Sequence, residues 1–279
     1  MIGITGATGE IGGRLARRLA ERGYDQRLIV RDAARAPALD AAETVTFGGY
    51  SDTAGMYRSF TGVSLLFLAS AREAEDRVEQ HKAAIDAAAA AGVTRIVYLS
   101  LISAASDATF TFARDHFQTE EHIRASGLDF TFSRQSLYLD LVPLLGGPDG
   151  VIRGPAGNGR LAPVSRDDIA DALVAMLTAR GHESATYDLT GPQALTLTEV
   201  AAEVSKFSDK PVIFQNETLD EAYASRASYA APDWELAGWI STYTAIAAGE
   251  FDVVTDHVER LTGHPPIGVP AFLSRYMQR

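Results

Sequence analysis

The sequence of 279 residues contains no cysteine and only three lysines, at positions 82, 206 and 210. Without cysteine, the chain has no disulfide, no thiolate nucleophile, and no iron–sulfur cluster or sulfur-ligated zinc. Its six histidines lack the spacing of zinc ligands, so we expect no metal site. Acidic residues outnumber basic ones by 36 to 25, which gives a net charge of −11. This balance argues against a nucleic-acid partner, because counterion release requires clustered lysine and arginine.

Long hydrophobic runs are also missing. The most apolar stretch covers residues 64–69, far short of the roughly 20 residues that a membrane-spanning helix needs. The amino-terminal residues lack the basic segment of a secretion signal and reach Gly3 and Gly6 at once. With 46% hydrophobic and 22% charged residues, the composition is that of a globular protein. We therefore expect a soluble cytoplasmic protein without a membrane partner.

Short apolar segments alternate with longer helical ones through the first half of the chain. The apolar segments predict buried strands at residues 2–5, 27–30, 45–47, 65–68, 95–99 and 130–132. The segments between them predict helices at residues 11–22, 33–41, 54–60, 72–91 and 113–126. Such alternation requires parallel strands with helices on both faces of the sheet. The sequence therefore predicts an α/β fold with a doubly wound, Rossmann-type parallel sheet.

The pattern becomes looser after about residue 141, where glycine-rich turns appear. Ser165 is the expected cap of a helix at residues 169–179, and Asp168 completes its capping box. We assign the chain to a cofactor domain and a smaller, mostly helical substrate or lid region. The cofactor domain comprises residues 1–150, with residues 160–192 returning to it, and the smaller region comprises residues 193–279.

The strongest motif is the glycine-rich loop ITGATGEIG at residues 4–12. It lies between the first predicted strand and the first predicted helix, where the helix N-terminus can face a pyrophosphate. Gly6 permits a tight turn, Gly9 lets the backbone approach a phosphate, and Gly12 lets the helix pack close to the strand. A purely structural turn is the alternative. We expect dinucleotide binding by Gly6, Thr8, Gly9, Glu10, Ile11 and Gly12.

The end of the second predicted strand bears on the choice of cofactor. An acidic residue there would accept a hydrogen bond from the ribose 2′-hydroxyl of NAD. Arg31 comes first instead, and a guanidinium binds a 2′-phosphate and stacks on adenine. Arg35 follows one turn later as a second candidate, whereas Asp32 keeps NADH open. We expect NADPH as the cofactor, with NADH less favoured and a solvated arginine as the alternative for Arg31.

Two other predicted strands end in loops that reach the same edge of the sheet. Tyr50 follows the third strand and is expected beside the adenine. The fourth strand is followed by three residues expected along the ribose and diphosphate: Ala69, Ser70 and Ala71. An ordinary turn at the end of a strand is an equally good interpretation of either loop.

These residues resemble the NmrA-like group of atypical short-chain dehydrogenases, and more narrowly the NADPH:quinone oxidoreductases and triphenylmethane dye reductases. The resemblance extends over nearly the whole chain and rests on residues 6–9, 30–32, 88–92, 97–100, 116–120, 126–128, 134, 154–159, 165–167 and 263–265. It implies an NADPH-dependent two-electron reductase of quinones or related conjugated electrophiles. A homodimer is the assembly expected from the resemblance.

The chain departs from ordinary short-chain dehydrogenases, because no tyrosine has a lysine four residues later. Ordinary short-chain dehydrogenases use a tyrosine with a lysine four residues later. Counting back from Glu120, His116 stands here where that lysine would be, and Phe112 stands where that tyrosine would be. Phenylalanine donates no proton, so the usual carbonyl/alcohol mechanism is disfavoured. Ser100 follows the fifth strand, where related proteins often carry a serine, and we retain it as an expected cofactor contact.

Hydride delivery to a conjugated acceptor mainly requires alignment, because protons can come from water. Gln135 is expected to bind a carbonyl oxygen or the nicotinamide carboxamide, and Tyr138 to stack or donate. His116 is the third weak catalytic candidate, with a histidine facing core or solvent as its alternative. Phe110 and Trp234 join Gln135 and Tyr138 as the expected lining of an apolar slot, although aromatic packing explains both equally well.

Related quinone reductases carry an asparagine–glycine pair where Gln135 and Ser136 stand, which leaves the acceptor open. The main hypothesis is an NADPH-dependent oxidoreductase of quinones or similar small-molecule acceptors. One alternative is an NmrA-like redox sensor that binds NAD(P) without turnover. The other is a reductase of imines, azo compounds, enones or dyes.

Overall fold

The computed structural model describes residues 1–40 and 42–276, and its centre is a seven-stranded parallel sheet. The strands follow the order β3-β2-β1-β4-β5-β6-β9. Their bounds are β1 Ile2–Thr5, β2 Gln26–Val30, β3 Ala42–Thr46, β4 Leu65–Leu68, β5 Arg95–Leu101, β6 Asp129–Gln135 and β9 Ala185–Leu189. The order reverses between β1 and β4, so the loops after these strands separate and open a crevice. The expected doubly wound Rossmann-type sheet is confirmed.

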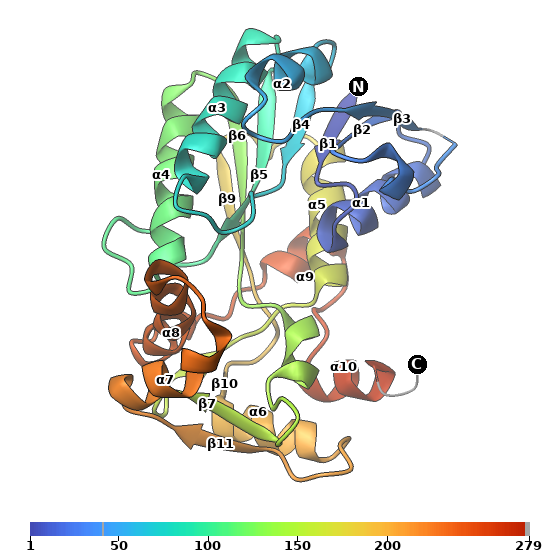
Figure 1. The fold of residues 1–279 in the computed structure, drawn as a ribbon. Coiled ribbons are helices and arrows are strands. Elements are labelled where there is room, and N and C mark those ends of the chain that lie inside the picture. Colours follow the sequence, from blue (N-terminus) through green and yellow to red (C-terminus); the bar gives the residue numbers. More distant parts are fainter. Residues whose placement is uncertain (41, 277–279) are drawn as a thin grey trace.

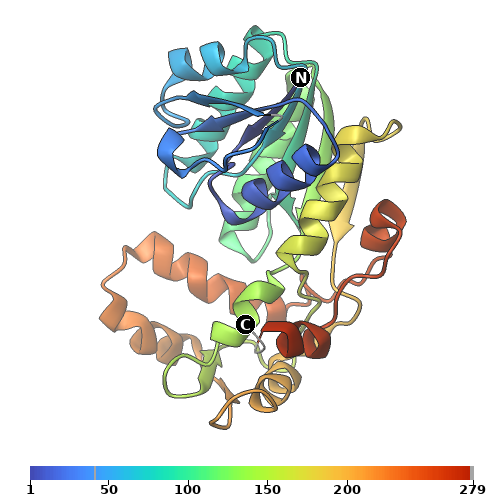
Figure 2. The same cartoon turned by 90° about the vertical axis from the view of Figure 1, so that its right-hand side faces the viewer.

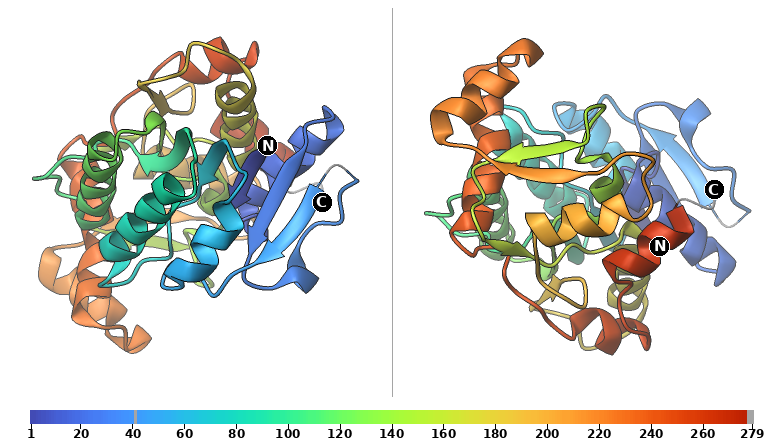
Figure 3. Two further views of the ribbon diagram at one scale, coloured as in Figure 1. Left: turned by 90° about the horizontal axis from the view of Figure 1, so that it is seen from above. Right: turned by 90° about the horizontal axis from the view of Figure 1, so that it is seen from below.

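Helices cover both faces of this sheet, as the views along it show (Figures 1 and 3). One face carries α1 (Glu10–Glu21) and α5 (Arg166–Thr178), which pack against each other. The other face carries α2 (Thr53–Phe60), α3 (Arg77–Ala90) and α4 (Thr111–Ala125). The predicted cap of α5 is present, because the Ser165 hydroxyl accepts from the Asp168 N–H at 3.0 Å.

Two predicted helices have different bounds in the structure. The helix expected at residues 33–41 is only a short 3₁₀ turn, η1 (Ala33–Arg35), and residue 41 lies outside the described residues. Pro37 explains the early end, because it lacks an N–H and disfavours the helical conformation of the residue before it. The helix expected from residue 72 begins at Arg77, because the polar backbone groups of Ala71 bond to side chains of α3 instead.

A smaller part lies at the carboxyl edge of the large sheet (Figures 1 and 2). Its helical elements are η2 (Leu139–Leu144), α6 (Leu197–Ser205), α7 (Leu219–Arg226), η3 (Ala227–Tyr229), α8 (Asp233–Ala247) and α10 (Val269–Tyr276). It also contains two two-stranded sheets, β7 (Val151–Gly154) with β11 (Ile213–Asn216) and β8 (Arg160–Leu161) with β10 (Leu195–Thr196). The remaining helix, α9 (His257–Thr262), packs on α5 beside the large sheet.

Within residues 1–40 and 42–276, no helix is both long and apolar enough to cross a membrane.

Candidate functional site

The glycine-rich loop connects β1 to α1 in the geometry that a bound phosphate requires. Gly6 has a φ of 65°, a conformation that favours glycine. A side chain at Gly12 would collide with the Gly6 carbonyl, so this close approach of helix and loop also requires glycine. Gly9 is the N-cap of α1 and provides no side-chain cap, which leaves the N–H groups of the first turn facing outward for an anion.

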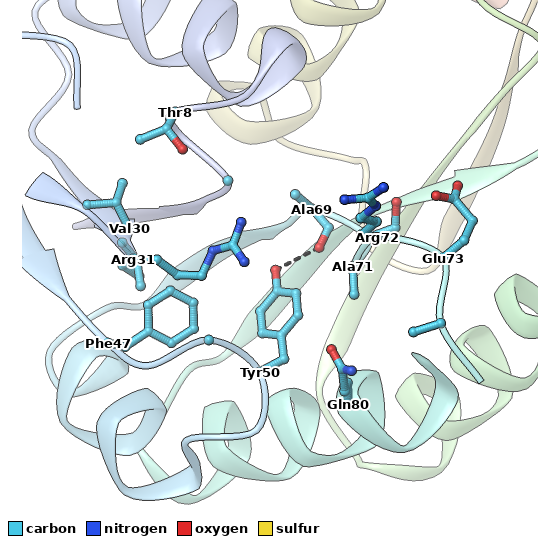
Figure 4. A pocket seen from close by; sticks show the side chains of 15 residues that line it. Thr8, Val30, Arg31, Phe47, Tyr50, Ala69, Ala71, Arg72, Glu73 and Gln80 are labelled. Atoms are coloured by element: carbon cyan, nitrogen blue, oxygen red, sulfur yellow. Dashed lines mark hydrogen bonds between the residues drawn. The ribbon is translucent and has the colours of Figure 1, made fainter. Parts of the chain in front are cut away.

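A cavity of about 340 Å³ opens beside this loop at the carboxyl ends of the strands (Figure 4). We call it the edge cavity. Its walls come from the loops that follow β1, β2, β3 and β4, at the reversal of the strand order. The structure brings together in it seven of the expected cofactor residues: Gly6, Thr8, Arg31, Tyr50, Ala69, Ser70 and Ala71.

Arg31, Asp32 and Arg35 differ in their surroundings. Arg31 is exposed, extends into the edge cavity, and has no hydrogen bond or ion pair within residues 1–40 and 42–276 (Figure 4). Asp32 accepts from the N–H of Ala34 at 3.0 Å and so caps η1. Arg35 lies with Arg17 in a neighbouring pocket that includes Thr8 and Gly9 of the glycine-rich loop. The structure therefore leaves Arg31, and not Asp32, free for a ligand.

Tyr50 ties the loop after β3 to the loop after β4. Its hydroxyl donates to the Ala69 carbonyl at 2.7 Å and lies 2.8 Å from the Thr5 hydroxyl. The Thr5 hydroxyl in turn accepts from the Ala69 N–H at 2.8 Å. Burial raises the pKa of Tyr50, so its hydroxyl keeps its proton. Thr5 lies within the glycine-rich motif, but its place at the end of a strand gave no sign of this role.

Two side chains of α3 hold the loop after β4 from the other side. The Ala71 N–H donates to His81 Nε2 at 2.8 Å, and Arg77 Nε donates to the Ala71 carbonyl at 3.0 Å. Burial and the nearby Arg77 charge lower the pKa of His81 to about 3. Neutral His81 then carries its proton on Nδ1, which lies 2.8 Å from the Thr119 hydroxyl. The only sequence signal for this clamp is the spacing of Arg77 and His81 by one helical turn, which is too common to predict it.

A second cavity of about 380 Å³ lies between the sheet edge and the smaller part. We call it the apolar cavity, because leucine, valine, isoleucine and aromatic side chains form most of its wall. It contains four expected residues, Phe110, His116, Gln135 and Tyr138. Ser70 and Glu73 line both cavities, so the two cavities adjoin at the loop after β4.

Trp234, an expected substrate contact, is not among the residues that line the apolar cavity. Trp239, five residues later on α8, lines the apolar cavity instead. Five residues correspond to about 140° around a helix, so the two indoles face different directions. Trp234 packs edge-on against Phe112, with ring centroids 6.3 Å apart, and therefore supports the wall from behind.

The polar groups of the apolar cavity cluster after β6. Gln135 Nε2 donates to the Tyr138 hydroxyl at 3.3 Å. The Gln135 Oε1 and Ser136 hydroxyl atoms are buried without a hydrogen-bond partner among the described residues. Burial raises the pKa of Tyr138, and the Arg166 guanidinium lies 4.8 Å from the centre of its ring. A protonated Tyr138 that accepts from Gln135 still has its own hydrogen to donate to a ligand.

His116 is a buried histidine with both ring nitrogens engaged. Its Nδ1 lies 2.9 Å from the Tyr98 hydroxyl, and its Nε2 lies 3.3 Å from Arg77 Nη2. Burial and the Arg77 charge hold the pKa of His116 well below its usual value. Neutral His116 is therefore not the acid that an imidazolium would be.

Three expected cofactor residues have side chains away from the edge cavity. The Ser100 side chain is fully buried and donates to Glu120 Oε1 at 2.6 Å, so it does not face the edge cavity. Glu10 pairs with Arg14 on the outer face of α1, and Ile11 packs in the core. Glu10 and Ile11, like Gly12, can reach a phosphate only through their N–H groups.

The arrangement fits a dinucleotide with a reactive end. The loop before α1 offers unbonded N–H groups for phosphates, and the unpaired Arg31 offers a cation at the adenosine side. The edge cavity adjoins the apolar cavity at Ser70 and Glu73, where the reactive ring would meet a second molecule. No cluster of histidine and carboxylate side chains suited to a metal occurs within the described ranges.

Comparisons with known proteins support the same interpretation. Residues 6–180 match the model of a family described as NAD(P)H-binding. Over 274 residues, the chain is 36% identical to quinone oxidoreductase 2 of Escherichia coli (strain K12), covering 95% of this chain and 94% of that protein. Two solved structures extend the similarity. An NADPH-dependent quinone oxidoreductase of Escherichia coli, complexed with NADPH, gives a TM-score of 0.89 at 32% identity over 99% of both chains.

The triphenylmethane reductase of Citrobacter sp. gives a TM-score of 0.87 at 28% identity, covering all of this chain (100%) and 99% of that one. These similarities confirm the resemblance to the quinone and dye reductases. They extend through the smaller part that forms one side of the apolar cavity.

Proposed function

Since the chain belongs to the NAD(P)H-binding family, we propose that this oxidoreductase uses NADPH to reduce quinones and similar small conjugated acceptors. The observation that carries the proposal is the junction of the two cavities at Ser70 and Glu73. One cavity fits a dinucleotide, and the other has the apolar wall and few polar groups that suit a flat conjugated ring. Their junction would place the two reactants in contact.

Arg31 supports NADPH over NADH in this proposal. Its guanidinium has no partner among the residues that the structure describes and extends into the edge cavity, where a 2′-phosphate would supply the missing charge. Asp32, the residue that would favour NADH, is engaged in capping η1. The chemistry of the reduced cofactor is hydride transfer to an electron-poor atom of the acceptor.

The protein's own part is alignment and hydrogen bonding. Gln135 at the end of β6 and Tyr138 in the segment after it face the acceptor, and Tyr138 offers its hydrogen to an acceptor oxygen. Trp239 and Tyr243 of α8 close the opposite side and exclude water. We propose that residues 1–150 and 160–192 bind the cofactor, while residues 193–279 complete the acceptor side.

We also propose a cytoplasmic homodimer, in line with the resemblance to the dye and quinone reductases. Sedimentation of the purified protein tests whether it is a dimer.

An acceptor panel tests the function directly. The purified protein is mixed with NADPH or NADH and a series of quinones, triphenylmethane dyes, azo compounds, imines and enones, and cofactor oxidation is followed by absorbance. We expect saturable turnover of quinones with NADPH in preference to NADH. Tight binding of the cofactor without turnover of any acceptor would contradict the proposal and favour a redox sensor. Turnover confined to another acceptor class would replace the substrate and keep the reductase.

A further inference from the structure

Tyr243 of α8 lines the apolar cavity and is held in place by two residues behind it. Its ring packs against Gly154, where an added Cβ would collide with the ring carbons. The Arg226 guanidinium lies 5.2 Å from the centre of the same ring. Gly154 ends β7 and Arg226 ends α7, so elements outside the cavity wall fix the position of a wall residue.

Arg226 is itself held in one orientation. Its exposed fraction is 8%, and that of its partner Glu217 is 4%. Arg226 Nη1 donates to Glu217 Oε2 at 3.0 Å, and Nη2 donates to the Arg153 carbonyl at 2.7 Å. The Glu217 N–H donates to the Gly154 carbonyl at 3.2 Å. These bonds connect β7 and α7 around the Tyr243 ring.

The Arg226–Glu217 ion pair provides geometry more than stability. Replacing a buried ion pair with apolar residues of similar volume is often neutral or stabilising. The planar guanidinium, however, binds its two partners in a fixed direction, and it stacks on an aromatic face. A wall residue that is already fixed in this way loses little conformational freedom when a ligand binds.

From this geometry we propose that Arg226 is a positioning residue of the acceptor site. Together with Gly154 it holds the Tyr243 ring as a rigid surface on which the flat ring of an acceptor stacks. The inference rests on the proposed function, because it takes the apolar cavity as the acceptor site. Aromatic pairs gain more than their buried area alone provides. A fixed tyrosine therefore selects flat conjugated acceptors over saturated molecules of the same size.

A binding experiment without turnover tests this selection. The probes are 1,4-naphthoquinone, which is flat, and decahydronaphthalene-1,4-dione, which has the same carbon skeleton and both carbonyls but no conjugated ring. Calorimetric titration of the protein with oxidised cofactor gives the affinity for each probe. We expect the wild type to bind the flat probe roughly twofold to tenfold more tightly. Tyr243→Leu should bind the two about equally.

Two variants disturb the ring from outside the cavity. Arg226→Lys keeps a charge beside Glu217 but lacks the planar group and its second nitrogen, so it should lower the preference for the flat probe. Gly154→Ala places a Cβ where the ring lies and should abolish the preference. Arg153→Lys is the matched control on β7, because the Arg153 side chain pairs with exposed Asp149 at 2.8 Å.

The ratio of the two affinities separates positioning from a general loss of stability, which would weaken both probes alike. Equal binding of both probes by the wild type, or a preference unchanged in Tyr243→Leu, would overturn the stacking surface. A preference unchanged in Arg226→Lys would overturn the positioning role of Arg226, and this variant decides the matter even if Gly154→Ala does not fold.

Turnover separates this inference from the function on which it rests. Arg226→Lys should raise KM for 1,4-naphthoquinone severalfold and leave kcat and the KM for NADPH nearly unchanged, because only acceptor binding is weakened. Quinone turnover with an unchanged KM in this variant would overturn the inference and keep the proposed function. A wild-type protein that reduces no quinone but still prefers the flat probe would refute the proposed function and support the stacking surface.

Discussion

Arginines of this site differ in what surrounds them, and their surroundings set their roles. Arg134 belongs to the stretch that carries the family resemblance, yet its guanidinium pairs with buried Glu120 at 2.8 Å from Nε. Ser100 donates to the same carboxylate. This cluster fixes α4 against β5 and β6, and its charged groups are engaged with one another and not with a ligand. Arg31 has no such partner among the described residues, which makes it the stronger cofactor residue.

Arg31→Ala tests that difference. Loss of the guanidinium should weaken NADPH binding by roughly 1.5–3 kcal/mol, the range of hydrogen bonds to charged groups, and leave NADH nearly unchanged. Titration of cofactor fluorescence with each nucleotide measures both affinities. Arg22→Ala is the matched control, because Arg22 is exposed at the carboxyl end of α1, away from the glycine-rich loop. Equal losses for NADPH and NADH would contradict the assignment of Arg31 to the 2′-phosphate.

His116→Ala tests whether the histidine takes part in proton transfer. Because neutral His116 is held between Tyr98 and Arg77, we expect the variant to lose stability and keep most of its quinone turnover. General acid–base catalysis typically contributes about 10²–10⁴-fold. Steady-state kinetics over a pH series, with the cofactor affinity measured separately, gives the answer. A thousandfold fall in kcat at unchanged cofactor affinity would restore His116 as an acid–base group.

At the scale of elements, local pattern predicted the sheet well and predicted side-chain direction poorly. Apolar segments bounded by glycine located the central strands, since a buried parallel strand is apolar on both faces. The start of α3 escaped prediction, because side chains of Arg77 and His81 hold the Ala71 backbone in place of helical hydrogen bonds. Trp234 and Trp239 share one helix, and only the packing of α8 on α4 decides which indole faces the cavity.

The clamp on Ala71 makes a prediction about the loop after β4. His81→Phe removes the acceptor of the Ala71 N–H and leaves a buried donor unpaired, which costs about 1–3 kcal/mol. We expect a lower urea midpoint and weaker NADPH binding, because the loop lines the edge cavity. His122→Phe is a matched control on α4, where the histidine is half-buried and pairs with exposed Asp86. Unchanged cofactor affinity in His81→Phe would show that the clamp only supports the fold.

For the whole molecule, the two buried histidines link stability to pH. His81 and His116 both have folded-state pKa values below the unfolded value near 6.5, mainly because of burial. The unfolded chain therefore binds more protons than the folded one below that pH, so stability falls as the pH drops. For His81 the loss continues down to its folded pKa of about 3.

Carboxyl groups with shifted pKa values change the stability at lower pH than the histidines do. Some of them raise the stability on acidification and others lower it. Asp168 and Asp188 have raised pKa values because of burial, and they gain stability as the pH falls. Asp167 has a lowered pKa, chiefly because Arg18 offsets the effect of its burial, and it loses stability in acid. These groups titrate mainly around their unfolded pKa values of about 4, so the histidines dominate the slope just below pH 6.5.

We therefore expect the urea midpoint to be nearly constant above about pH 7 and to decline from about pH 6.5 toward pH 5. A His81→Gln variant keeps an acceptor for the Ala71 N–H without a group that titrates there, so its midpoint should decline less steeply over the same interval. Urea titrations of both proteins at several pH values measure the two slopes. Equal slopes would mean that His81 is not the source of the pH dependence. A midpoint that rises on acidification would contradict the neutral state of both histidines.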